Sequence, residues 1–152
     1  MQPGFEKELK SLAIPIVEAT SSVYYSAIKN LLPTPAKSHY LFNLRDFARV
    51  VAGVMMAPGP NVPDKASISR LWVHELYRVF YDRLVFDEDR DYLFNNVKDV
   101  AKDILGVEFD VIFEELNLDK AEHIQDQHLR SLVFCDFEDP KGKCEACYRF
   151  AS

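Results

Sequence analysis

Glycine is scarce in this 152-residue sequence, and the motifs that depend on it are missing. The 5 glycines form neither the G-x-x-x-x-G-K-[ST] loop nor the G-x-G-x-x-G loop that cradles phosphates, and no G-x-S-x-G turn presents a nucleophilic serine. The 4 histidines have no evident catalytic serine or cysteine paired with them. These absences exclude a P-loop nucleotidase and an α/β-hydrolase, so we expect no enzyme activity from this chain on its own.

Long apolar runs and an excess of positive charge are also missing. No apolar run approaches the ~20 residues that cross a bilayer, and residues 1–10 contain no basic stretch that leads into an apolar segment. Lys and Arg number 18 against 24 Asp and Glu, which gives a net charge of −6 and argues against binding to duplex nucleic acid. We therefore expect a soluble, cytoplasmic protein with no membrane partner and no nucleic-acid partner.

Cysteine is absent from the first 134 residues, and Cys135, Cys144 and Cys147 lie near the end of the chain. This distribution is not the disulfide framework of a secreted domain, and it fits a reducing compartment. Cys144 and Cys147 have the two-residue gap of a zinc half-site, but a structural zinc site needs four ligands, and the other candidates are Cys135, His128 and His123. We favour two ordinary thiols over a metal site and keep Cys144 and Cys147 as weak candidates.

The composition is that of one folded domain, with 48% apolar and 28% charged residues. Apolar side chains recur every three or four residues across residues 9–31, which predicts a helix with one apolar face. Pro15 interrupts this pattern and predicts a kink or a fresh start. Pro33 and Pro35 end the segment and force extended backbone around Thr34, so residues 34–42 are expected to form a short, stiff connector.

A second helix is expected to begin at Leu44. Asn43 can cap its free N–H groups, and Asp46 can serve as the acidic partner of a capping box. The helix should end in the proline-rich loop at residues 56–63.

Apolar spacing and capping residues predict four more helices and one short strand. They are a helix capped by Asp64 or Ser67 that runs to about residue 85, a helix from Asp89 or Asp91 to residue 105 that is closed by Gly106, helices at residues 110–116 and 120–128, and a strand within residues 129–137. The predicted fold class is mainly all-α, a bundle of about five helices with a short strand near the C-terminus.

The pair His74 and Glu75 begins like the helix of a zinc protease, but that motif requires a second histidine four residues later, where this sequence has Arg78. Arg78 and Asp82 are four residues apart on the same predicted helix. We therefore interpret this segment as packing and ion pairing rather than as a metal site.

Arg45 is the candidate binding residue, because an arginine is unfavourably placed in the first turn of a helix. The positive end of the helix dipole disfavours a cation there, and a nearby anion would offset that cost. Two kinds of anion remain open on this reasoning: an external phosphate, or a carboxylate such as that of Asp46.

Three motifs carry a resemblance to a known family. The stretches LLPTPAKSHYLFNLRDF at residues 31–47, LWVHE at 71–75 and RVFYDRL at 78–84 resemble the dynein heavy chain family, axonemal type. In detail they are similar to the helical lid of the third AAA+ module of the motor ring. The stretch LRSLVFCDF at residues 129–137 is similar to the junction with the fourth module. The resemblance implies a lid-like helical domain over residues 4–128 and a junction segment over residues 129–141, and it leaves residues 142–152 as an unmatched, flexible tail.

The resemblance also implies a function. In that family the lid closes over ATP or ADP with Mg, and an arginine at the sensor II position, matched here by Arg45, reaches the phosphates. The large subdomain with the P-loop, the acidic metal-binding strand and sensor I lies outside this sequence, so no cofactor is expected on the isolated chain. The implied partners are neighbouring AAA+ modules, and the microtubule through other regions, in the ciliary axoneme.

The alternative interpretation is a self-standing helical module that binds protein partners. Under that interpretation apolar residues such as Leu9, Tyr24, Val50 and Trp72 would form an exposed patch.

Overall fold

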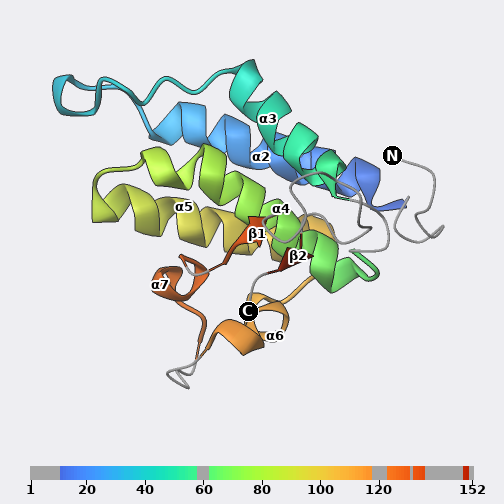
Figure 1. Cartoon of the computed structure of the whole chain (residues 1–152). Coiled ribbons are helices and arrows are strands. Elements are labelled where there is room, and N and C mark those ends of the chain that lie inside the picture. Colours follow the sequence, from blue (N-terminus) through green and yellow to red (C-terminus); the bar gives the residue numbers. More distant parts are fainter. Residues whose placement is uncertain (1–10, 58–61, 118–122, 131, 136–148, 151–152) are drawn as a thin grey trace.

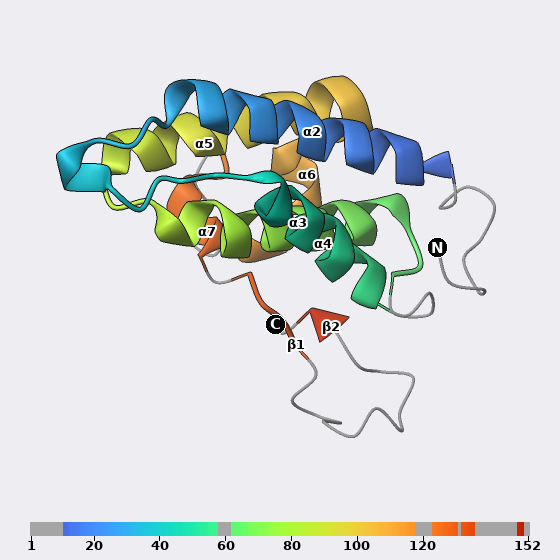
Figure 2. The same ribbon diagram turned by 90° about the horizontal axis from the view of Figure 1, so that it is seen from above.

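The computed structural model describes residues 11–57, 62–117, 123–130, 132–135 and 149–150. The described part is a helical bundle, which confirms the predicted fold class. Helix α2 (Ala13–Asn30) packs against α3 (Leu44–Met56) and α5 (Asp87–Val100), and α3 packs against α4 (Lys65–Val79) (Figures 1 and 2). The short helix α6 (Phe109–Ile112) contacts α4, and the short helix α7 (Asp126–Leu129) contacts α5.

Helix α2 (Ala13–Asn30) begins two residues before Pro15, which agrees with the fresh start, one of the two outcomes predicted for this proline. The proline lies in the first turn, where its missing N–H costs no helical hydrogen bond. The helix ends before the two prolines, and Thr34 is extended, with φ −131° and ψ 169°. The connector contains one 3₁₀ turn, η1 (Pro35–Lys37).

Helix α3 (Leu44–Met56) begins at the predicted residue with the predicted cap at Asn43. Helix α4 (Lys65–Val79) is capped by Asp64, whose carboxylate accepts the Ser67 N–H at 3.1 Å. The prediction that this helix runs to about residue 85 was wrong, because it ends at Val79 and a 3₁₀ turn, η3 (Tyr81–Arg83), follows. Phe80 and Leu84 are buried, so the apolar spacing continues past the helix end and does not mark it.

Helix α5 (Asp87–Val100) starts two residues before the first predicted position. Asp87, Glu88 and Asp89 fill its first turn, where carboxylates stabilise the positive end of the helix dipole. The helix continues as a π-helical segment, η4 (Ala101–Leu105), and ends at Gly106. Gly106 has a φ of 60°, the left-handed conformation that glycine adopts without strain, which confirms the predicted stop.

The remaining elements are short. Helix α6 (Phe109–Ile112) and the 3₁₀ turn η5 (Glu114–Leu116) occupy the predicted 110–116 helix. Helix α7 (Asp126–Leu129) begins later than the predicted helix at 120–128, since residues 123–125 are not helical. The Gln125 backbone N–H donates to the His128 ring at 2.9 Å and so closes the first turn.

Strand β1 (Phe134–Cys135) confirms the predicted strand, and it pairs antiparallel with β2 (Arg149–Phe150). Residues 138–152 carry little regular pattern in the sequence, so β2 was not predicted. Cys144 and Cys147 lie outside the described residues.

Trp72 lies at the centre of the core: it belongs to α4, is fully buried and contacts α2. Its indole N–H donates to the Thr20 hydroxyl at 2.9 Å, and that hydroxyl donates to the Ile16 carbonyl at 2.7 Å. Tyr24 and Val50 are buried as well. The exposed apolar patch expected for a self-standing module is therefore not formed by Tyr24, Val50 or Trp72; Leu9 lies outside the described residues.

Gly53 lets α3 approach α4 closely. A Cβ atom at this position would lie 2.0 Å from a carboxylate oxygen of Glu75, whose side chain is buried against α3. The absence of a side chain at Gly53 therefore makes room for a buried carboxylate between the two helices.

Candidate functional site

The start of helix α3 is ordered by a reciprocal pair of hydrogen bonds. The Asn43 side chain accepts the Arg45 backbone N–H at 2.8 Å, and the Asp46 carboxylate accepts the Asn43 backbone N–H at 3.0 Å. This capping box satisfies backbone donors that a helix start leaves free, and such a cap contributes about 1 kcal/mol to helix stability. The first turn therefore holds Arg45 in a defined place.

Asp46 is buried, with 3% of its surface exposed, and its carboxylate is already occupied. One oxygen lies 3.1 Å from an Arg83 guanidinium nitrogen, and the other lies 3.6 Å from Arg49. Asp46, the carboxylate that the sequence offered as an example of a partner for Arg45, therefore pairs with Arg83 and Arg49 instead.

The Arg45 side chain is exposed at the start of α3. Among the residues that the structure describes, no hydrogen bond or ion pair engages its guanidinium group. A cation without a carboxylate partner at the positive end of a helix dipole is electrostatically unfavourable, and an anion bound there would relieve that cost. Because the cap already engages the backbone N–H groups of Asn43 and Arg45, the Arg45 guanidinium is the group that this helix start offers to an anion such as phosphate.

Arg83 ties the connector to the start of α3. Its guanidinium donates to the carbonyl oxygens of His39 and Leu41, each at 3.0 Å, and lies 4.8 Å from the centre of the Phe42 ring. In return, the His39 ring donates to the Arg83 carbonyl at 2.9 Å. The sequence did not identify Asp46 as the partner of Arg83, because the two residues are too distant in the chain for spacing to pair them.

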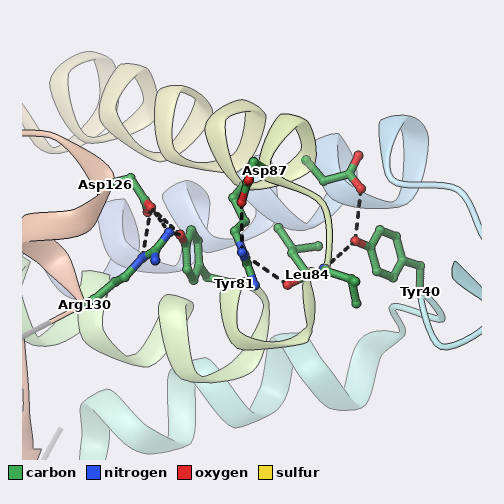
Figure 3. A network of polar contacts seen from close by, with 9 residues as sticks. Tyr40, Tyr81, Leu84, Asp87, Asp126 and Arg130 are labelled. Atoms are coloured by element: carbon green, nitrogen blue, oxygen red, sulfur yellow. Dashed lines mark hydrogen bonds and ion pairs between the residues drawn. The ribbon is translucent and has the colours of Figure 1, made fainter.

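A second polar network fixes the other side of the connector (Figure 3). The Tyr40 hydroxyl donates to Asp89 at 3.0 Å and accepts the Val85 backbone N–H at 2.9 Å. Nearby, Arg90 donates to the Leu84 carbonyl at 3.1 Å and pairs with Asp87 at 3.0 Å. These contacts fasten the connector and η3 to the start of α5.

Figure 3 also shows how η3 contacts α7 through Tyr81, Asp126 and Arg130. The buried Tyr81 hydroxyl donates to the Asp126 carboxylate, and Arg130 contacts both of these groups, at 3.1 Å and 2.8 Å. Burial, followed by the hydrogen bond to Asp126, raises the pKa of Tyr81 to about 12. The Tyr77 ring stacks on the Tyr81 ring at 4.4 Å, and burial raises the pKa of Tyr77 above its ordinary value.

The pair His74 and Glu75 lies in the packed interior of the bundle. Both side chains are buried, their polar atoms lie 3.1 Å apart, and the His74 ring packs against the Phe134 ring. Arg78 pairs with Asp82 at 3.0 Å, which confirms the predicted ion pair.

Within the described ranges, no cluster of three His, Cys, Asp or Glu side chains has the arrangement of a metal site. The two candidate cysteines, Cys144 and Cys147, fall outside those ranges. None of the described helices combines the length and the apolar character that crossing a bilayer requires.

Comparison with known proteins defines the class. Residues 16–119 match the family model of the AAA+ lid domain, so the chain belongs to the AAA+ lid family. Its sequence further identifies the lid as that of a dynein heavy chain of the axonemal type.

Three relatives illustrate this similarity. The chain is 41% identical over 139 residues to dynein axonemal heavy chain 3 of Homo sapiens, a match that covers 91% of this chain and 3% of the relative. It is 46% identical over 137 residues to dynein axonemal heavy chain 12 of Mus musculus, a match that covers 90% of this chain and 4% of that relative. It is 49% identical over 98 residues to dynein axonemal heavy chain 1 of Rattus norvegicus, a match that covers 64% of this chain and 2% of that relative. The chain thus spans only a few per cent of the length of these relatives.

Proposed function

We propose that this chain is the lid of a nucleotide-binding module in an axonemal dynein motor, and that Arg45 senses the nucleotide phosphates. In this proposal the module is the third of the ring, and residues 129–141 lead into the fourth. The observation that carries the proposal is the exposed guanidinium of Arg45, which has no partner among the described residues, on the first turn of a capped helix.

The chemistry of the site is electrostatic. ATP or ADP with Mg is held mainly by a large subdomain outside this chain, which supplies the hydrolytic chemistry. The part of Arg45 is to donate charge-assisted hydrogen bonds to phosphate oxygens, and these are among the stronger hydrogen bonds in proteins. The capping box and the buried Asp46 hold the backbone of Arg45, so the point from which its side chain extends is fixed before a phosphate binds.

The lid relays nucleotide state because it is one packed body. When Arg45 gains or loses its phosphate partner, the bundle rotates as a rigid unit between neighbouring modules, which are its partners in the ring. The wider role is microtubule-based movement in the ciliary axoneme, with the microtubule bound by other regions of the heavy chain. The isolated chain hydrolyses no ATP in this account.

The test is the nucleotide affinity of this module in a heavy chain that carries Arg45→Ala. Loss of one charge-assisted contact with a phosphate is expected to weaken ATP binding about tenfold or more. Arg78→Ala is the matched control, because Arg78 is an exposed arginine that pairs with Asp82 and has no contact with the start of α3 among the described residues. Equal affinities for the wild type and Arg45→Ala would remove Arg45 from the site.

A further inference from the structure

We propose that Arg83 is the positioning residue for Arg45: through Asp46 and the connector, it sets the place from which Arg45 reaches the phosphate. This inference rests on the proposed function of Arg45. Arg83 itself is assigned no contact with the nucleotide.

The geometry that supports this role is the convergence of Arg83 on a single segment. From η3, its guanidinium reaches the side chain of Asp46 and the backbone carbonyls of His39 and Leu41, at 3.0–3.1 Å, and it stacks near the ring of Phe42. These four residues surround the cap of α3 on both sides. Arg83 therefore fixes both the chain that enters the helix and the first turn of the helix itself.

One ion pair and two hydrogen bonds lead in sequence from Arg83 to the backbone of Arg45. Arg83 pairs with the Asp46 carboxylate, the same carboxylate accepts the Asn43 N–H, and the Asn43 side chain accepts the Arg45 N–H. Each link orients the next, because Asp46 can accept from Asn43 only while its carboxylate keeps its present rotamer.

The buried charge makes Arg83 hard to replace. Removal of one partner from a buried charge pair leaves the other charge uncompensated. The remaining basic neighbour of Asp46, Arg49, is 3.6 Å away and its side chain is 63% exposed, so it compensates poorly. Without Arg83, Asp46 is therefore expected to turn toward water and give up its bond to Asn43.

The chemistry also requires arginine rather than lysine. One planar guanidinium pairs with a carboxylate, donates to two carbonyl oxygens and lies over an aromatic ring, and an ammonium group cannot do all of these at once. Arg83→Lys is thus expected to keep the pair with Asp46 and to lose the hold on His39 and Leu41.

The first experiment measures amide hydrogen exchange by NMR in the 152-residue chain. In Arg83→Gln, the amides of Asn43 and Arg45 are expected to exchange about tenfold faster, because the local cap opens more often, while amides inside α2 and α4 keep their rates. Arg83→Lys should give an intermediate rate. The matched control is Arg78→Gln, which removes a surface ion pair near the end of α4 and should leave the Asn43 and Arg45 rates unchanged.

Two results would overturn the proposal. Unchanged exchange at Asn43 and Arg45 in Arg83→Gln would show that Arg83 does not order the start of α3. An equal acceleration of all slowly exchanging amides would show that Arg83 supports only global stability.

The second experiment is a double-mutant cycle on nucleotide affinity, in a heavy chain that carries this lid. If Arg83 acts through Arg45, then Arg83→Gln weakens binding in the wild type and adds nothing in an Arg45→Ala background. Additive losses would contradict the positioning role. If Arg45→Ala alone has no effect, the proposed function fails, and the exchange rates alone decide whether Arg83 orders this turn.

Discussion

At the scale of single residues, Arg45 and Asp46 differ sharply although they are neighbours in the chain. Arg45 is exposed, while Asp46 is buried and holds two arginines and one backbone N–H. Successive residues of a helix point in different directions, so one can face the interior while the other faces outward. The buried residue orders the turn, and the exposed one remains available for a ligand.

The identity of Arg45 as a candidate could be predicted from the sequence, because its place in a capped first turn is local information. The occupancy of Asp46 by Arg83 could not, because it depends on how η3 packs against the connector. The sequence alone therefore left a phosphate and a carboxylate open as partners for Arg45, and the fold removed Asp46 as its partner.

Gly53→Ala is expected to destabilise the chain, although alanine is the better helix former by about 1 kcal/mol. The new Cβ would overlap the carboxylate of Glu75, which is buried and cannot simply move into water. Overpacking of this kind costs about 1–3 kcal/mol beyond that gain, as measured by chemical denaturation.

The control for this prediction is the double variant Gly53→Ala/Glu75→Ala, in which the overlapping atoms of Glu75 are removed. Gly53→Ala should therefore lower the free energy of unfolding less in the Glu75→Ala background than it does in the wild type. A Gly53→Ala variant that is more stable than the wild type would contradict the close approach of α3 and α4.

At the scale of elements, local signals placed some boundaries and missed others. The start of α3 and the stop at Gly106 depend on residues within one turn, so they could be predicted. The end of α4 was missed because buried Phe80 and Leu84 extend the helical spacing into η3. Strand β2 was missed because two residues have no periodicity, and only their pairing with β1 defines them.

Tyr81→Phe is expected to loosen the contact between η3 and α7. The substitution keeps the ring and removes the hydroxyl that joins Asp126 and Arg130. The free energy of unfolding should fall by about 1–2 kcal/mol at neutral pH, the cost of a lost hydrogen bond to a charged group. Tyr92→Phe is a suitable comparison, because its hydroxyl contacts Ser26 and Asn30 away from α7.

The difference in unfolding free energy between wild type and Tyr81→Phe depends on pH through the pKa of Tyr81. The folded state holds the phenol proton more tightly than the unfolded chain, since the pKa rises from 10 to about 12. The stabilisation from Tyr81 is therefore complete below about pH 10 and is lost as the pH rises through about 12. If the difference in unfolding free energy between wild type and Tyr81→Phe widened above pH 10, that result would contradict the hydrogen bond to Asp126.

At the scale of the whole molecule, the described part of the chain carries an apolar face on α2 and α3. Exposed Ile14, Val17 and Met55 lie on α2 and α3, and a hollow of about 100 Å³ lies between these helices. Such a face is typical of a surface that is covered in a larger assembly. This fits a chain that spans only a few per cent of its relatives, whose other parts contain the rest of the nucleotide site in our proposal.

Sedimentation of the purified chain at several concentrations tests this view of the surface. A lid separated from the rest of its motor is expected to self-associate as the concentration rises, and Val17→Glu, which places a charge in the apolar face, should reduce that association. A chain that stays monomeric throughout would favour the alternative of a self-standing interaction module.

The most direct test of the central claim is a structure of a heavy chain that carries this lid, with an ATP analogue bound in the module that the lid closes. The account predicts that a guanidinium nitrogen of Arg45 lies about 3 Å from a phosphate oxygen, while Arg83 stays paired with Asp46. An Arg45 side chain that faces solvent, with the phosphates held only by other residues, would contradict it.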